Sequence, residues 1–259
     1  MTVRPLAEMV AWLDTYLEVA RVPDSANALN GLQVENRSGS VGRIAAAVDA
    51  TLETITDVGR REGAAEGGVL LLVHHGLFWD GNIPLTDRRF RRVTALLDND
   101  IALYAAHIPL DLHPEVGNNA GLARALGVAI EGTFAEHRGV EIGVHGALDL
   151  SREALTARLD EQLRTRTHMI PGGPRQVRRV GIVTGAGSSA LPEAHALGLD
   201  TLVTGEAPHH AYFDAMEWGI NLALAGHYAT EQVGVQALAE RLARQFGVPW
   251  AFHWHPTGL

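Results

Sequence analysis

The sequence predicts an α/β protein built from two related halves with mostly parallel sheets. Short apolar runs alternate with helix-like segments along the chain, which is typical of parallel strands joined by helical crossovers. The motifs of the first half recur in the same order in the second half. With 259 residues, 46% of them hydrophobic and 20% charged, the chain can bury a sizeable core without disulfides.

The elements follow in order. Apolar residues at helical spacing from Leu6 to Leu17 predict an opening helix, and residues 23–36, with an Asn-Gly dipeptide, predict a loop. Six buried strands are expected at 44–48, 69–73, 101–106, 180–184, 201–204 and 222–225. Residues 141–150 predict an isolated strand, and residues 250–255 predict a terminal one.

The internal repeat suggests where the halves divide. His107-x-x-x-Asp111 in the first half and His227-x-x-x-Glu231 in the second half occupy equivalent places in the order of the repeated motifs. We expect a first half over residues 1–128 and a second over 129–259, with the C-terminal segment packing back on the first. The alternative is that any two strand–helix–strand runs look alike. A true duplication would allow the halves to face one shared site.

Two missing residue types exclude much chemistry. Without cysteine, thiolate zinc sites, Fe–S clusters, disulfides and cysteine nucleophiles are excluded. All 21 basic residues are arginine, so a Walker A lysine and a pyridoxal phosphate Schiff base are excluded as well. The 13 histidines leave imidazole as the main ligand for a borderline metal.

The charge balance bears on partners and location. A net charge of −9 disfavours a strong nucleic-acid footprint. The one basic cluster, at residues 88–92, is a solvated helix face or, alternatively, an anion site. The longest apolar run, residues 69–73, is too short to span a bilayer, so no membrane partner is expected. Glu8 and Asp14 argue against a signal peptide, and we expect a cytoplasmic protein.

Histidines and carboxylates follow the expected strands. His74 and His75 come directly after the buried run VLLLV, at the carboxyl end where open α/β sheets place ligands. At two further strand ends, His107 is followed by Asp111 and His227 by Glu231, each four residues later.

These positions predict a dinuclear metal centre. Its ligands are His74, His75, Asp111, His227 and Glu231, which suit two divalent ions such as Zn, Fe, Mn, Co or Ni. The alternative is that each histidine is a hydrogen-bonded structural residue.

Other histidines compete for such a role. His253-x-His255 lies on the expected terminal strand and is either a chelating pair or a surface pair near the chain end. His209 and His210 begin a helix and could line the site or support its ligands.

A glycine-rich turn provides a further candidate site. Residues 183–190 fit G-x-G-x-x-A between a strand and a helix. Gly185, Gly187 and Ser188 could bind a phosphate or carboxylate at the helix N-terminus. With Glu206 as the ribose-binding acid, the same turn could instead hold NAD(P).

Together these segments resemble the dinuclear metal-centre hexamer family, also called GTP cyclohydrolase I type 2 homologues or NGG-interacting-factor-like proteins. The matching segments are NGLQV (30–34), VHHGLFW (73–79), HIPLD (107–111), HPEVGNN (113–119), TGE (204–206) and GHYATE (226–231). The resemblance implies two related α/β halves with the metals between them, a toroidal homohexamer, and the same five ligands. His107 matches a family position close to the site.

The leading hypothesis is a metal-dependent hydrolase of a nucleotide or similar small anion, with GTP as the named candidate. His107 or His210 would shuttle the proton. One alternative is a metal-binding hexamer or protein-interaction scaffold without turnover. Another is an NAD(P)-binding oxidoreductase that uses the glycine-rich turn.

Overall fold

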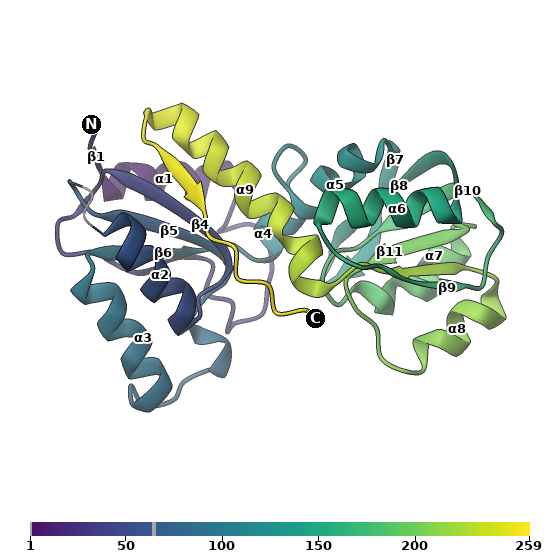
Figure 1. The fold of residues 1–259 in the computed structure, drawn as a ribbon, viewed down its shortest axis with the longest axis horizontal. Helices are drawn as coiled ribbons and strands as arrows, with labels where there is room; N and C mark the ends of the chain where they lie inside the picture. The colour runs from purple at the N-terminus through teal and green to yellow at the C-terminus, as the bar shows by residue number, and fades with distance from the viewer. Residues whose placement is uncertain (1, 64–65) are drawn as a thin grey trace. The chain divides into compact units, whose positions relative to one another are not determined.

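The computed structural model describes residues 2–63 and 66–259. It confirms an α/β fold. The chain divides into two compact units, residues 1–110 with 235–255, and residues 111–234 with 256–259. The expected boundary between residues 128 and 129 therefore falls inside the second unit. Each unit is described by itself below, and Figure 1 labels most of the elements.

The first unit contains a five-stranded sheet in the order β13-β4-β5-β6-β2. Its strands are β13 (Trp250–Phe252), β4 (Arg43–Asp49), β5 (Val69–His75), β6 (Ile101–Ala105) and β2 (Gly31–Val34). The first four are mutually parallel and β2 is antiparallel to β6. The short strands β1 (Arg4–Pro5) and β3 (Ser40–Val41) form a separate antiparallel pair. The C-terminal strand β13 thus joins the sheet of the first unit.

Helices cover both faces of this sheet. On one face, α2 (Leu52–Glu62) and α3 (Asp87–Asp98) pack Ile55, Val58 and Leu96 onto the strands, as Figure 1 shows. On the other, the buried Tyr104 of β6 donates a hydrogen bond of 2.8 Å to Asp14 of α1 (Leu6–Tyr16). A single-turn 3-10 helix, η1 (Phe78–Asp80), follows β5. In the central strands β4 and β5 the polar side chains lie at the strand ends, where Asp49, His74 and His75 follow buried apolar residues.

The second unit contains a six-stranded sheet in the order β7-β8-β10-β11-β12-β9. Its strands are β7 (Ala129–His137), β8 (Val140–Ser151), β10 (Gln176–Ile182), β11 (Thr201–Thr204), β12 (Asn221–Leu224) and β9 (His168–Pro171). The three central strands β10, β11 and β12 are parallel, whereas β7, β8 and β9 pair antiparallel. Residues 141–150 are therefore not an isolated strand, because β8 pairs with both β7 and β10.

Helices also cover both faces of the second sheet. α5 (Asn118–Leu126) and α6 (Arg152–Leu163) bury Leu122, Leu126, Leu155 and Leu159 on one face. α7 (Leu191–Ala196) and α8 (Ala211–Trp218) cover the other face, as Figure 1 shows. The remaining helices are α4 (Ile108–Asp111), the 3-10 helix η2 (Gly187–Ala190), and α9 (His227–Phe246), which begins in the second unit and ends in the first.

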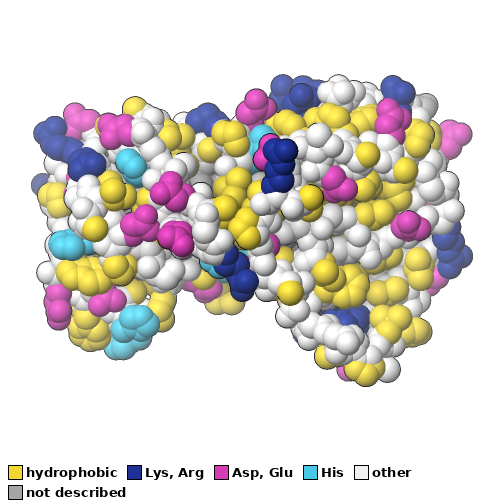
Figure 2. Space-filling model, turned by 180° about the vertical axis from the view of Figure 1, so that it is seen from behind, with side chains coloured by type: hydrophobic (Ala, Val, Ile, Leu, Met, Phe, Trp, Pro, Cys, Tyr) yellow, Lys and Arg dark blue, Asp and Glu magenta, His cyan; other side chains and the backbone are white. Residues whose placement is uncertain are grey.

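Among the described residues, no helix combines the length and apolar composition needed to span a bilayer. On the face seen in Figure 2, arginine side chains lie scattered among acidic and apolar ones.

Candidate metal centre

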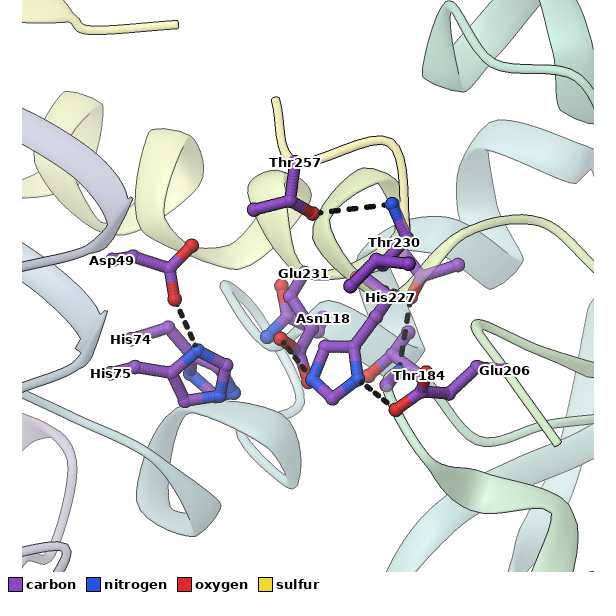
Figure 3. Close-up of polar contacts among 12 residues, drawn as sticks. Asp49, His74, His75, Asn118, Thr184, Glu206, His227, Thr230, Glu231 and Thr257 are labelled. Atoms are coloured by element: carbon purple, nitrogen blue, oxygen red, sulfur yellow. Dashed lines mark hydrogen bonds and ion pairs between the residues drawn. The ribbon is translucent and has the colours of Figure 1, made fainter. Parts of the chain in front are cut away.

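The last two residues of β5 place two imidazole rings at the carboxyl end of the first sheet. His74 is fully buried, and its Nδ1 lies 2.9 Å from the carbonyl oxygen of Ala106. His75 Nδ1 lies 2.8 Å from Oδ1 of Asp49, the last residue of β4, as Figure 3 shows. Because a carbonyl or carboxylate oxygen can only accept, Nδ1–H donates in both contacts. With Nδ1 donating, a ring in its neutral form carries its lone pair on Nε2, the arrangement typical of metal-binding histidines.

His107 lies beside these two rings. Its ring centroid is 5.0 Å from that of His74 and 5.7 Å from that of His75. Its Nδ1 lies 3.0 Å from both carboxylate oxygens of Asp24. Burial alone raises the pKa of Asp24, but the hydrogen bond and charge of His107 outweigh it and lower the pKa to about 2. His74, His75 and His107 could hold a metal ion, since one nitrogen of each lies within 4.8 Å of the others.

In the second unit, Asp111 is buried and held by asparagines. Its Oδ1 accepts a 2.8 Å hydrogen bond from Asn118 Nδ2, and its backbone oxygen accepts one of 3.2 Å from Asn119 Nδ2. Asn118 is itself fully buried and accepts from the Gly234 amide of α9 at 2.7 Å. Asn119 Oδ1 accepts from the Thr184 amide, just after β10, at 2.8 Å. The two asparagines thus connect Asp111 to both a strand end and α9.

His227 and Glu231 form a second polar pair in this unit, on the first turns of α9. His227 Nε2 lies 3.1 Å from Glu231 Oε2, and His227 Nδ1 lies 2.8 Å from Glu206 Oε1, as Figure 3 shows. The hydrogen bond from His227 to Glu231 raises the pKa of His227 to about 9, against the effect of burial and with further help from Glu206. The same negative potential favours a divalent cation.

This pKa shift predicts a pH-dependent stability for the metal-free protein. Because the His227 pKa is about 9 in the folded chain and 6.5 in the unfolded one, the folded state binds this proton more tightly. The resulting stabilisation is fully present below pH 6.5 and is lost as the pH rises through about 9. We expect about 3 kcal/mol of unfolding free energy to disappear as the pH rises from below 6.5 to above 9.

Urea denaturation of chelator-treated protein at both ends of this pH interval measures the loss. His227→Gln removes the titrating group and should flatten the difference. An equal fall in the unfolding free energy of wild type and His227→Gln would contradict the assignment.

The glycine-rich turn lies against this polar pair. Gly185 has a φ of +65°, and a Cβ added there would collide with Oε1 of Glu231. The Gly185 amide donates to Thr230 Oγ1 at 3.0 Å, and the Gly187 amide donates to Thr204 Oγ1 at 2.9 Å. Ser188 is buried in η2. The two amides expected to hold an anion are therefore engaged by threonine hydroxyls, and the anion site stays a prediction.

The other candidate histidines lie in contrasting surroundings. His210 is exposed and lies immediately before α8. Among the described residues, it does not belong to any group of three His, Asp or Glu side chains close enough to hold one metal ion. His253 is only 1% exposed. The interpretation of His253 and His255 as a surface pair is therefore wrong for His253, because β13 joins the sheet and buries the residue that follows it.

Several supporting residues are not predictable from the motifs. Asp24 and Asp49 each orient a histidine of the first unit, and Asn118 positions Asp111. The sequence suggests Glu206 only as a ribose-binding acid, yet here it hydrogen-bonds His227. One sequence feature could have pointed to Asp49 as a partner of His75. It directly follows the expected strand at residues 44–48, and this strand pairs with the strand that carries His75.

Comparison with known proteins identifies the family. The profile of the DUF34/NIF3 (NGG1p interacting factor 3) family matches residues 5–256. The chain belongs to this family. The resemblance inferred from the motifs is thereby confirmed.

Named relatives and solved structures match nearly the whole chain. Proteins named GTP cyclohydrolase 1 type 2 homolog share 45% identity in Deinococcus radiodurans, with 97% of this chain and 94% of the relative covered, and 46% in Halobacterium salinarum, with 94% and 96% covered. The crystal structure of TTHA1606 from Thermus thermophilus superposes with a TM-score of 0.87 at 38% identity, covering 99% of this chain and 100% of that one. HcgD from Methanocaldococcus jannaschii, at 21% identity and a TM-score of 0.82 over 97% and 98% of the chains, shows the fold alone.

Proposed function

We propose that the protein is a hydrolase that uses two divalent ions to act on a nucleotide or a similar small anion. The observation that carries this proposal is the orientation of the strand-end histidines. Both His74 and His75 donate through Nδ1 to an oxygen acceptor, which directs the lone pair to Nε2. Membership of the DUF34/NIF3 family, with relatives named GTP cyclohydrolase 1 type 2 homolog, supports the same function.

In this proposal the two ions are held by His74, His75, Asp111, His227 and Glu231. Three imidazoles and two carboxylates form a nitrogen and oxygen set that Zn, Fe, Mn, Co and Ni accept. When bound, a pair of divalent ions supplies Lewis acidity and activates water for attack. Because His227 must lose its extra proton to become a ligand, metal binding releases protons and strengthens with pH.

The chain's own residues supply positioning and proton transfer. Asp24 holds His107 through Nδ1, so His107 Nε2 can accept a proton while the Asp24 carboxylate stabilises the resulting imidazolium. Asn118 donates to Asp111 and fixes the direction of that carboxylate. His210 remains the alternative proton shuttle predicted from the sequence.

The proposed substrate rests on the names of the relatives, and the proposed assembly rests on the family resemblance. GTP is the first candidate, with hydrolytic attack on the imidazole ring of its guanine. We further propose a homohexamer in the cytoplasm, which light scattering of the purified protein and cell fractionation would test.

A metal-controlled substrate screen tests the activity. Chelator-stripped protein is reloaded separately with each of the five metals and incubated with GTP, other nucleotides and simple phosphate esters. We expect loss of purine absorbance or release of a hydrolysis product only in the reloaded samples. If no compound is consumed with any metal, the hydrolase proposal fails and the metal-binding scaffold takes its place.

A further inference from the structure

A second group of histidines and carboxylates lies in the first unit, apart from the residues named above. His253 and His255 follow β13, and Asp57 lies on α2. One ligand atom from each lies within 4.8 Å of the other two. His253 Nδ1 is 2.9 Å from Asp57 Oδ2, and His255 Nε2 is 3.4 Å from the same oxygen. Both rings therefore converge on a single carboxylate oxygen.

The other oxygen of Asp57 is engaged on its opposite side. Asp57 Oδ1 accepts from Arg60 at 2.6 Å and lies 3.0 Å from Arg61 Nε. Although burial raises the pKa of Asp57, the hydrogen bonds from His253 and Arg60 hold it well below its ordinary value. Asp57 is thus an ionised carboxylate with one oxygen neutralised by arginines and the other facing two imidazoles.

The outward nitrogen of each ring faces a glutamate of α2. His253 Nε2 is 3.6 Å from Glu62 Oε1, and His255 Nδ1 is 3.6 Å from Glu53 Oε1. Arg43 engages the remaining oxygen of Glu62 at 2.6 Å. A ring that binds a metal through one nitrogen commonly donates through the other to a carboxylate, and both rings have a carboxylate in that place.

Burial adds an independent indication. His253 is 1% exposed, and among the described residues its Nε2 finds no hydrogen-bond partner. A buried ring nitrogen without a hydrogen bond carries a desolvation cost. If His253 binds a metal through Nδ1, the proton of the neutral ring lies on Nε2 and can be donated toward Glu62, which lowers this cost.

We propose that Asp57, His253 and His255 form a mononuclear site for a borderline divalent cation such as Zn²⁺, distinct from the proposed dinuclear centre. Bonds of about 2.0–2.2 Å in a tetrahedral site place neighbouring ligand atoms about 3.4 Å apart, close to the spacings seen here. Water completes the fourth position. The ion ties the segment after β13 to α2, two parts of the chain separated by 196 residues.

Zinc binding to the Asp111→Asn variant isolates this site, because that change removes a proposed ligand of the dinuclear centre. Stripped protein is dialysed against Zn²⁺, and bound metal is counted per chain with and without His255→Asn. His168→Asn, on the exposed residue of β9, is the matched control. We expect His255→Asn to lose one ion per chain, or to bind it at least tenfold more weakly, while His168→Asn changes nothing.

Thermal unfolding provides a second readout of the same site. Zn²⁺ should raise the melting temperature of the parent and of His168→Asn but not of His255→Asn. If His255→Asn does not fold, Glu53→Gln replaces it as the test variant, because the Glu53 side chain is 82% exposed. This substitution should weaken zinc binding several-fold. Equal zinc binding by the parent and by each folded variant would overturn the proposal and leave a hydrogen-bonded Asp57–His253 pair.

Discussion

Asp111→Asn should abolish metal-dependent turnover while leaving the fold intact. The substitution keeps an oxygen that can accept from Asn118 Nδ2, so the buried hydrogen bond survives with the amide suitably oriented. It removes the negative charge needed to offset a divalent cation. Changing only the residues that support metal ligands costs about 10–100-fold in affinity or activity, so loss of a ligand should exceed 100-fold.

Asp149→Asn is the matched control for this substitution. Asp149 is exposed on β8 of the same unit, where its carboxylate accepts from Gln176. The Asp149→Asn variant should turn over substrate at the wild-type rate. Wild-type turnover by a folded Asp111→Asn variant would remove Asp111 from the proposed centre.

Gly185→Ala should damage both stability and metal binding. The residue has a φ of +65°, where an alanine costs about 1–2 kcal/mol. Its Cβ would also collide with the Glu231 carboxylate and lie 3.4 Å from His227 Nε2. Displacing a packed side chain costs about 1–3 kcal/mol, so the unfolding free energy should fall by about 2–5 kcal/mol.

Gly219→Ala separates backbone strain from this collision. Gly219 has a φ of +70°, but no atom lies within 4 Å of the position its Cβ would take. It should cost only about 1–2 kcal/mol and leave metal binding unchanged. Denaturant unfolding and zinc titration of both variants make the comparison. If the two variants behave alike, Gly185 does not act through Glu231.

The buried parallel strands were predictable because their side chains are apolar on both faces. The expected run at residues 69–73 lies in β5, the run at 101–106 covers β6 and extends one residue beyond it, and the run at 201–204 is β11 itself. The antiparallel edge strands were harder to predict. The sequence does not indicate β7 and β9, because these edge strands carry exposed residues and lack a long apolar run.

The candidate ligands were predictable from strand ends, but their partners were not. His74 and His75 stand out because they follow five apolar residues. Asp24 contacts His107 across a sequence separation of 83 residues, and Asp49 contacts His75 across a separation of 26 residues. Such pairings depend on strand order and loop path, which local patterns do not specify. The same limit explains His253, whose burial follows from the pairing of β13 with β4.

Metal content per chain tests the central claim most directly. Wild type and Asp111→Asn are stripped, reloaded with the same metal, desalted and analysed for metal and protein. The proposed dinuclear centre predicts that wild type holds about two more ions per chain than the variant. Equal metal content in the two folded proteins would contradict it.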